Sequence, residues 1–180
     1  LDLKLHDIPN TVAGALKVLT ALGVDIINVH AVGGPKMLQA ARAAVTEQAA
    51  ALKIQAPRLI AVTILTSMDA AQFAALNYKN TIPEQVVALA RLARECGLDG
   101  VVASPLEAAA IRQACGPDFL IVTPGVRPAG AAQGDQSRVA TPAGAIKNGA
   151  SHIVVGRPIT QAADKKAAAA AIVAEIRNVK

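Results

Sequence analysis

The feature that most restricts the fold of this chain is a local pattern that occurs four times. In each copy a glycine is followed by a short polar step and then by a run of β-branched and apolar residues. The copies lie at 23–29, 97–102, 116–122 and 149–155. Glycine commonly follows the end of a helix, and a strand that is apolar on both faces is typical of a buried parallel sheet. The pattern therefore predicts helices that lead into parallel strands.

Residues typical of helix starts predict the helix that follows each strand in a β/α unit. Ser104-Pro105 and Thr141-Pro142 place an N-cap hydroxyl before a proline, and Thr81 precedes Glu84 at capping-box spacing. The apolar runs at 1–5 and 59–65 bring the number of expected strands to six. Helices are expected near 11–22, 35–51, 70–76, 83–96, 105–114, 142–148 and 162–176.

The number of units indicates the architecture. Six units in 180 residues correspond to about 30 residues each, so eight would reach the ~250 residues of a typical (β/α)8 barrel. We therefore predict an α/β fold, a (β/α)8 TIM barrel with six of its eight β/α units in this chain. It would be a single domain over 1–180 that is incomplete at its N-terminal side, because the chain opens within a strand. An open doubly wound sheet is the alternative, although no GxGxxG or P-loop motif follows any strand.

Composition excludes several classes of protein. With 53% hydrophobic and 17% charged residues the chain should fold, and with 2% aromatic residues it lacks a stacking platform for single-stranded nucleic acid. The net charge of +5 is scattered, which argues against nucleic acid as a partner and fits a small anionic ligand. Cys96 and Cys115 have no metal-ligand spacing, and no apolar run has membrane length. We expect a soluble, cytoplasmic protein that binds no membrane.

Charged residues interrupt the first expected strand in the pattern Asp2-x-Lys4-x-x-Asp7. Side chains alternate along a strand, so Asp2, Lys4 and His6 would share one face. An amphipathic strand with a wet face, and Asp7 as a turn residue, would explain the pattern without a function. The other strands are apolar on both faces, however, so we interpret the charges as an array in a pocket. The two carboxylates would hold a buried Lys4 as an ammonium that can donate a proton.

Glycine and arginine follow two consecutive strands near the C-terminal end. Pro124 and Arg127 follow the strand at 119–122, while Gly156 and Arg157 follow the strand at 152–155. Loops after the last two strands of a barrel frequently bind phosphate, which predicts a dianion site here. Three further residues complete the set of candidates. Gln136 could reach the same ligand or face solvent, Thr66 could line the site or cap a helix, and His30 is assigned no role.

These segments resemble the orotidine 5′-phosphate decarboxylase family in its bacterial type. The resemblance is carried by residues 2–11, 28–31, 65–67, 96–102, 123–127 and 155–157, and it extends over essentially the whole chain. It implies a (β/α)8 barrel and a homodimer with sites at the subunit interface. It also implies decarboxylation of orotidine 5′-phosphate to UMP, in pyrimidine synthesis, without a metal or another cofactor.

The resemblance also implies a role for each candidate residue. Lys4 would protonate C6 of the pyrimidine, Asp2 would lie against the substrate carboxylate, and Asp7 would reach into the neighbouring subunit's site. The remaining candidates would bind substrate: Thr11, Thr66 at the pyrimidine edge, Pro124, and Arg127, Gln136, Gly156 and Arg157 at the phosphate end.

The chain departs from the family pattern in one respect. The family supplies an aspartate after its first strand and a lysine after its second, and neither has a counterpart here. We therefore expect this stretch alone to be inactive, or to belong to a longer protein. Two rival functions are a Mg²⁺-dependent enzyme similar to 3-keto-L-gulonate-6-phosphate decarboxylase and an inactive phosphate-binding barrel fragment.

Overall fold

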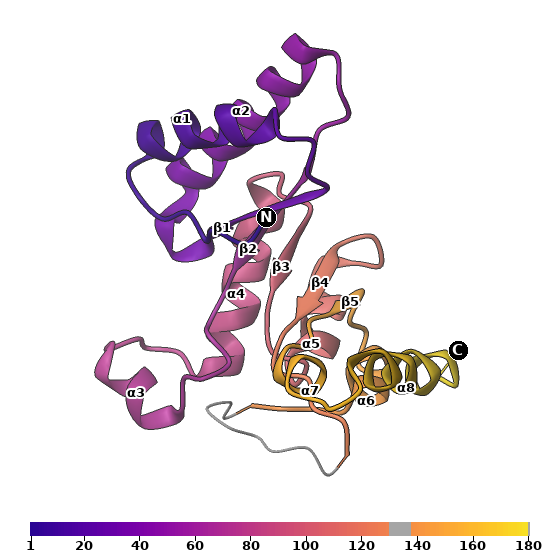
Figure 1. The fold of residues 1–180 in the computed structure, drawn as a ribbon. Coiled ribbons are helices and arrows are strands. Elements are labelled where there is room, and N and C mark those ends of the chain that lie inside the picture. Colours follow the sequence, from indigo (N-terminus) through magenta and orange to yellow (C-terminus); the bar gives the residue numbers. More distant parts are fainter. Residues whose placement is uncertain (130–137, 180) are drawn as a thin grey trace. The chain divides into compact units, whose positions relative to one another are not determined.

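A computed structural model describes residues 1–129 and 138–179, and its elements alternate between helix and strand (Figure 1). The strands form one sheet in the order β1-β2-β3-β4-β5, in which β1 pairs parallel to β2 and β4 parallel to β5. The elements are α1 (Pro9–Thr20), β1 (Ile26–His30), the 3-10 helix η1 (Ala31–Gly33), α2 (Gly34–Leu52), β2 (Arg58–Val62), α3 (Ala70–Ala75), α4 (Ile82–Glu95), β3 (Gly100–Val102), α5 (Ala108–Cys115), β4 (Leu120–Thr123), α6 (Pro142–Lys147), β5 (His152–Ile153), α7 (Arg157–Thr160) and α8 (Lys165–Arg177).

Five of the six expected strands are confirmed, and the strand expected at 1–5 is wrong. In this segment only Leu5 pairs with the sheet, through a parallel bridge to Val29. The N–H of Lys4 donates to the side-chain oxygen of Asn28 at 2.7 Å, and Lys4 has a positive φ of 53°. A side chain thus takes the place of a backbone partner, and the left-handed residue ends the alternation of faces.

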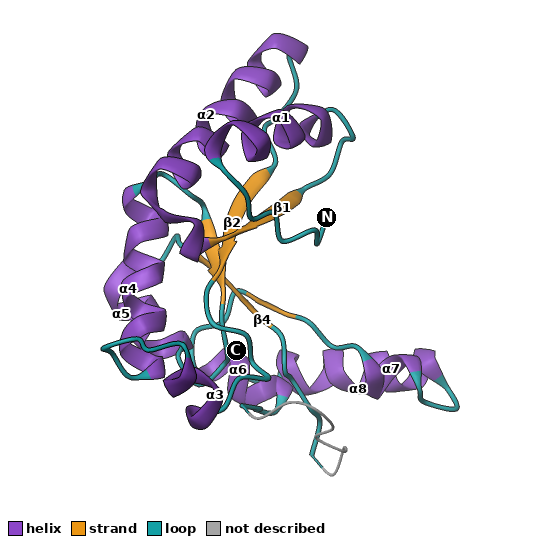
Figure 2. Cartoon of the chain, turned by 90° about the vertical axis from the view of Figure 1, so that its left-hand side faces the viewer, coloured by secondary structure: helices purple, strands orange, loops and turns teal. Residues whose placement is uncertain are grey.

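The chain divides into two compact units, of which the first comprises residues 1–63 and 87–101. In this unit α1 lies alongside α2 (Figure 2), and β1 pairs with β2 from Ile26 opposite Arg58 to His30 opposite Val62. Val12, Leu16 and Thr20 recur every four residues on the buried face of α1. The core consists of fully buried aliphatic side chains, among them Leu16, Ile27, Leu38, Val45 and Leu59.

The second unit comprises residues 64–86 and 102–180. Here β4 pairs with β5, and α8 packs against both α6 and α7. Thr141 caps α6 as predicted, because its hydroxyl accepts from the Gly144 N–H at 3.1 Å. The helix expected from 105 begins only at Ala108, because the Ser104 hydroxyl instead accepts from the Leu106 N–H in the preceding turn.

No helix in the described part of the chain is long and apolar enough to cross a membrane.

Arg112, in the last turn of α5, holds three segments of the second unit together. The Nη1 and Nη2 atoms of its guanidinium share their N–H donors among five acceptors at 2.7–3.0 Å, which are the carbonyl oxygens of Gly116, Pro117, Phe119 and Gly149 and the hydroxyl of Ser151. The Ser151 hydroxyl in turn accepts from the N–H of Ile121 in β4. A guanidinium offers five donors in a fixed plane, so one side chain connects the end of α5 to the segments before β4 and β5.

We expect Arg112→Lys to lower the free energy of unfolding by about 2 kcal/mol or more, because one ammonium cannot replace the fork of donors. Denaturant unfolding measures the loss. Arg91→Lys, on the exposed surface of α4, is the matched control and should change the free energy by less than about 0.5 kcal/mol. Equal stability of the two variants would contradict the structural role of Arg112.

Candidate active site

An ion pair between Asp2 and Lys4 is the chemical centre of the first unit. The Lys4 Nζ donates to Asp2 Oδ2 at 2.7 Å, so the predicted partnership of these two residues is confirmed. The prediction that Lys4 is buried between two acids is wrong, because its side chain is 40% exposed and Asp2 is its one ion-pair partner among the described residues. Strand β1 is at the edge of the sheet, so segment 1–7 has the sheet on one side only.

Asn28 supports this ion pair, and sequence analysis missed it. Its amide Nδ2 donates to Asp2 Oδ1 at 2.5 Å, while its Oδ1 accepts from the Lys4 N–H at 2.7 Å. Asn28 is only 5% exposed and lies within an otherwise apolar strand. The available signal was a buried polar residue in such a strand, since a residue of this kind requires partners.

Electrostatics favour an ionised Asp2. The hydrogen bond from Lys4, followed by that from Asn28, holds the pKa of the Asp2 carboxyl below its usual range. The pKa of His30 is lowered as well, first by burial and then by the positive charges of His6 and Lys4. The rings of His6 and His30 lie 5.6 Å apart. A carboxylate and an ammonium are therefore paired beside an imidazole whose charged form is disfavoured.

Asp7 lies just before α1, and Thr11 lies in its first turn. Asp7 is exposed, and its carboxylate accepts from the N–H of Ile8 at 2.6 Å, immediately before the helix begins at Pro9. Thr11 is exposed in the first turn. The structure thus places Asp7 at a turn, with its side chain accessible from outside the unit.

The predicted phosphate-binding residues belong to the second unit and follow two paired strands. Because β4 and β5 are parallel neighbours, with Val122 opposite His152, the segments after them begin at the same edge of the sheet. Arg127 is 8% exposed, and its Nη1 donates to the carbonyl oxygen of Val126 at 2.9 Å. Pro124 is half-buried, and the loop turns at Gly125, with φ of 76°.

Arg157, at the other strand end, is exposed and begins α7, with Gly156 as its N-cap residue. Thr66 follows β2 and is 7% exposed. The alternative that Thr66 caps the next helix is wrong, since Asp69 caps α3 by accepting from the Gln72 N–H at 2.8 Å. Gln136 lies outside the described residues.

A buried ion pair between Glu107 and Arg138 anchors the turn that carries Thr66. Arg138 Nη1 donates to Glu107 Oε1 at 2.6 Å, and its Nη2 donates to the carbonyl oxygens of Ile64 and Leu65. Both side chains are almost fully buried. Burial raises the pKa of Glu107, and the adjacent Arg138 opposes that rise. Sequence analysis assigned no functional role to Glu107.

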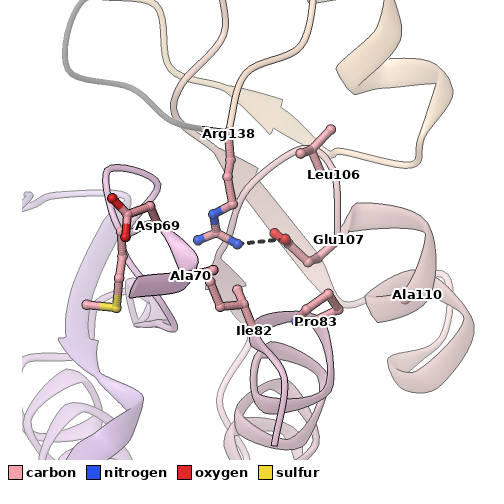
Figure 3. Close-up of a pocket in the computed structure, with 9 residues that line it drawn as sticks. Asp69, Ala70, Ile82, Pro83, Leu106, Glu107, Ala110 and Arg138 are labelled. Atoms are coloured by element: carbon pink, nitrogen blue, oxygen red, sulfur yellow. Dashed lines mark hydrogen bonds and ion pairs between the residues drawn. The ribbon is translucent and has the colours of Figure 1, made fainter. Parts of the chain in front are cut away.

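The Glu107–Arg138 pair borders a cavity of about 480 Å³ within the second unit (Figure 3). The cavity is lined by Met68, Asp69, Ala70, Ile82, Pro83, Leu106, Glu107, Ala110 and Arg138. Glu107 Oε2 and Arg138 Nε are buried without a hydrogen-bond partner. In the described part of the chain no three His, Cys, Asp or Glu side chains converge as a metal site, so we assign no metal ligands.

Comparison with known proteins assigns the family. The model of the orotidine 5′-phosphate decarboxylase / HUMPS family matches residues 1–172. The chain belongs to this family. An orotidine 5′-phosphate decarboxylase of Moorella thermoacetica is 63% identical over 180 residues, which are 99% of this chain and 71% of that protein. One of Trichlorobacter lovleyi is 56% identical over 176 residues, which are 98% of this chain and 72% of that protein.

Solved structures agree with the family. The crystal structure of orotidine 5′-phosphate decarboxylase from Lactobacillus acidophilus matches with a TM-score of 0.84 and 44% identity, over 98% of this chain and 74% of that one. The enzyme from Pyrococcus horikoshii matches with a TM-score of 0.69 and 28% identity, over 98% and 72% of the two chains. The predicted fold class, the (β/α)8 barrel, is thereby confirmed for the family to which the chain belongs.

We expect Lys4→Met to raise the pKa of Asp2, because the hydrogen bond from the ammonium is the largest cause of its depression. Titration of the side-chain carboxyl by carbon NMR measures the change. Glu84 is an internal reference, since its pKa is lowered by hydrogen bonds from Thr81 at the start of α4 and should not move. An Asp2 titration that is the same with and without Lys4 would show that the ion pair does not form in solution.

Proposed function

We propose that this chain provides the decarboxylase activity for which its relatives are named, the conversion of orotidine 5′-phosphate to UMP in pyrimidine synthesis. The observation that carries the proposal is the Asp2–Lys4 ion pair, at 2.7 Å, in a chain 63% identical to a protein of that name. An ammonium held by a carboxylate is a positioned proton donor. The reaction proposed for it needs neither a metal nor another cofactor.

Lys4 would act on the carbon that loses carbon dioxide. When the C6–carboxylate bond breaks, its electron pair stays on an sp² carbon that has no cofactor to delocalise it. A cation fixed beside C6 stabilises this charge as it develops, and Nζ then transfers a proton to form UMP. Because the Lys4 side chain is 40% exposed in this chain, the neutral amine can regain a proton from solvent.

Asp2 would have two effects in this mechanism. Its carboxylate holds the ammonium of Lys4 in place, at 2.7 Å. Placed against the substrate carboxylate, it would also repel that group's negative charge, which passes to C6 as carbon dioxide leaves, so the repulsion is weaker in the transition state than in the bound substrate. The depressed pKa of Asp2 supports this role, because it keeps the residue charged.

The remaining candidates would bind parts of the substrate that do not react. Arg127, Gln136, Gly156 and Arg157 would hold the phosphate, and Pro124 would lie in the same loop as Arg127. Thr66 would contact the pyrimidine edge, with Thr11 as a further substrate contact. Binding energy from a phosphate far from C6 can be used to orient the reacting carbon.

The assembly belongs to the proposal as well. The active form would be a cytoplasmic homodimer, in which Asp7 of one subunit reaches the site of its partner. The exposed carboxylate of Asp7 before α1 supports such a contact. We further propose that residues 1–180 form one N-terminally incomplete barrel domain. The experiments below therefore use the full-length protein that contains this chain.

The test of the proposed function is loss of orotidine 5′-phosphate absorbance on addition of the full-length protein. We expect turnover that persists in EDTA, and we expect Lys4→Ala to reduce kcat by about 10³-fold or more, because both the cation and the proton donor are removed. Affinity for UMP, measured by calorimetry, should change little. Turnover that disappears in EDTA would favour the Mg²⁺-dependent rival, and UMP binding without turnover in the unsubstituted protein would favour an inactive binding protein.

We expect Arg157→Ala to weaken UMP binding by about 10- to 100-fold, the effect of losing one charge-assisted contact to phosphate. Calorimetric titration with UMP and with uridine distinguishes loss of a phosphate contact from a general loss of nucleoside binding. Uridine lacks the phosphate and should bind both proteins equally. Arg91→Ala, at an exposed position of α4, is the control for loss of a positive charge. Unchanged UMP affinity in Arg157→Ala would exclude this residue from the phosphate site.

A further inference from the structure

We infer that Asn28 is a positioning residue for the decarboxylation, and that its side-chain amide fixes the Lys4 ammonium by binding the Asp2 carboxylate and the Lys4 main chain together. The inference rests on the proposed function, because it assigns to Asn28 a part in placing the proton donor. Asn28 itself would not touch the substrate.

The two ends of the amide bind the two residues of the ion pair. Nδ2 donates to Asp2 Oδ1 at 2.5 Å, which leaves Oδ2 to accept from Lys4 Nζ at 2.7 Å. Oδ1 of Asn28 accepts from the N–H of Lys4 at 2.7 Å. Carboxylate, lysine backbone and ammonium therefore form a closed ring of interactions around one buried amide.

Asn28, at the centre of this ring, is buried within a regular strand. Asn28 is 5% exposed and lies in the middle of β1, where it is opposite Ile60 of β2. Its main chain also fixes the register of the segment, since its carbonyl accepts from the Leu5 N–H, and the His30 N–H donates to the Leu5 carbonyl at 2.9 Å. A site built on a strand is placed more precisely than one that depends on a loop alone.

The backbone of Lys4 shows what the amide stabilises. A φ of 53° is left-handed, a conformation that is unfavourable for a residue with a Cβ. The hydrogen bond from the Lys4 N–H to Asn28 forms in this conformation and offsets that cost. Without it, the left-handed conformation in which Lys4 Nζ contacts Asp2 at 2.7 Å would be less stable.

Asparagine suits this position because its side chain carries both a donor group, the NH2, and an acceptor, the carbonyl oxygen. An aspartate would still accept from the Lys4 N–H, but it would set a second carboxylate against Asp2. Alanine would remove both interactions. Among the described residues, the charged and titratable groups around Asp2 and Asn28 are Lys4, His6 and His30, so a carboxylate at 28 would also change the balance of charge at the proton donor.

The experiment compares Asn28→Asp and Asn28→Ala in the full-length protein with the unsubstituted enzyme. Asn178→Asp, the same change at an exposed residue after α8, is the control for net charge. For each protein kcat and KM for orotidine 5′-phosphate are measured across pH, and affinity for UMP is measured by calorimetry. UMP affinity also reports whether the variant has folded.

Both Asn28 variants are expected to lose about 10- to 100-fold in kcat, while KM and UMP affinity change by less than about 3-fold. In Asn28→Asp the acid limb of the kcat profile should also move to higher pH. The reason is that losing the Asn28 donor and gaining a neighbouring carboxylate both raise the pKa of Asp2, so Asp2 becomes protonated at a higher pH than in the unsubstituted enzyme. Asn178→Asp should leave all of these values unchanged.

Two results would overturn the inference. A kcat and an acid limb in Asn28→Asp equal to those of the unsubstituted enzyme would show that the amide does not position Lys4. A parallel loss of UMP binding and turnover in both variants would mark Asn28 as structural. Absence of turnover in the unsubstituted enzyme is a different outcome, because it would overturn the proposed function itself.

Discussion

The chemistry assigned to this chain depends on one buried amide that holds a carboxylate and an ammonium in contact. Asp2 and Lys4 lie in a segment that pairs with the sheet through Leu5 alone, so regular strand pairing cannot place them. The side chain of Asn28 supplies the missing interactions, and it is itself fixed by β1. Asp2 and Lys4 lie on an irregular and partly exposed segment. Hydrogen bonds to Asn28 of β1, rather than burial, therefore fix their positions relative to the sheet.

In the second unit, the candidate binding residues lie in the loops that follow the strands. β4 and β5 end in loops with arginine and glycine, residues suited to binding a phosphate through a planar cation and accessible backbone N–H groups. Arg138 spans from Glu107 to the carbonyl oxygens before Thr66 and so ties the turn after β2 to its own unit. Under the proposed function, these loops of the second unit bind the phosphate.

Much of the fold could be predicted because it depends on local signals. Glycine after helix ends and apolar runs located five strands, and capping residues located the starts of α4 and α6. The segment at 1–5 was misread because alternation was assumed where a side-chain interaction of Asn28, more than twenty residues away, sets the backbone. The spacing of residue types along the sequence does not predict contacts between residues that are far apart in it. For the same reason Lys4 was found by its pattern, while Asn28, Glu107 and Arg138 were not, since their roles depend on which distant groups they meet.

The most direct test of the account is a crystal structure of the full-length protein with an unreactive UMP analogue substituted at C6. The account predicts that Lys4 Nζ lies within hydrogen-bond reach of the C6 substituent, at about 3 Å, and still contacts Asp2 while Asp2 contacts Asn28. A Lys4 ammonium turned to solvent, with Asp2 separated from both Lys4 and Asn28, would contradict it.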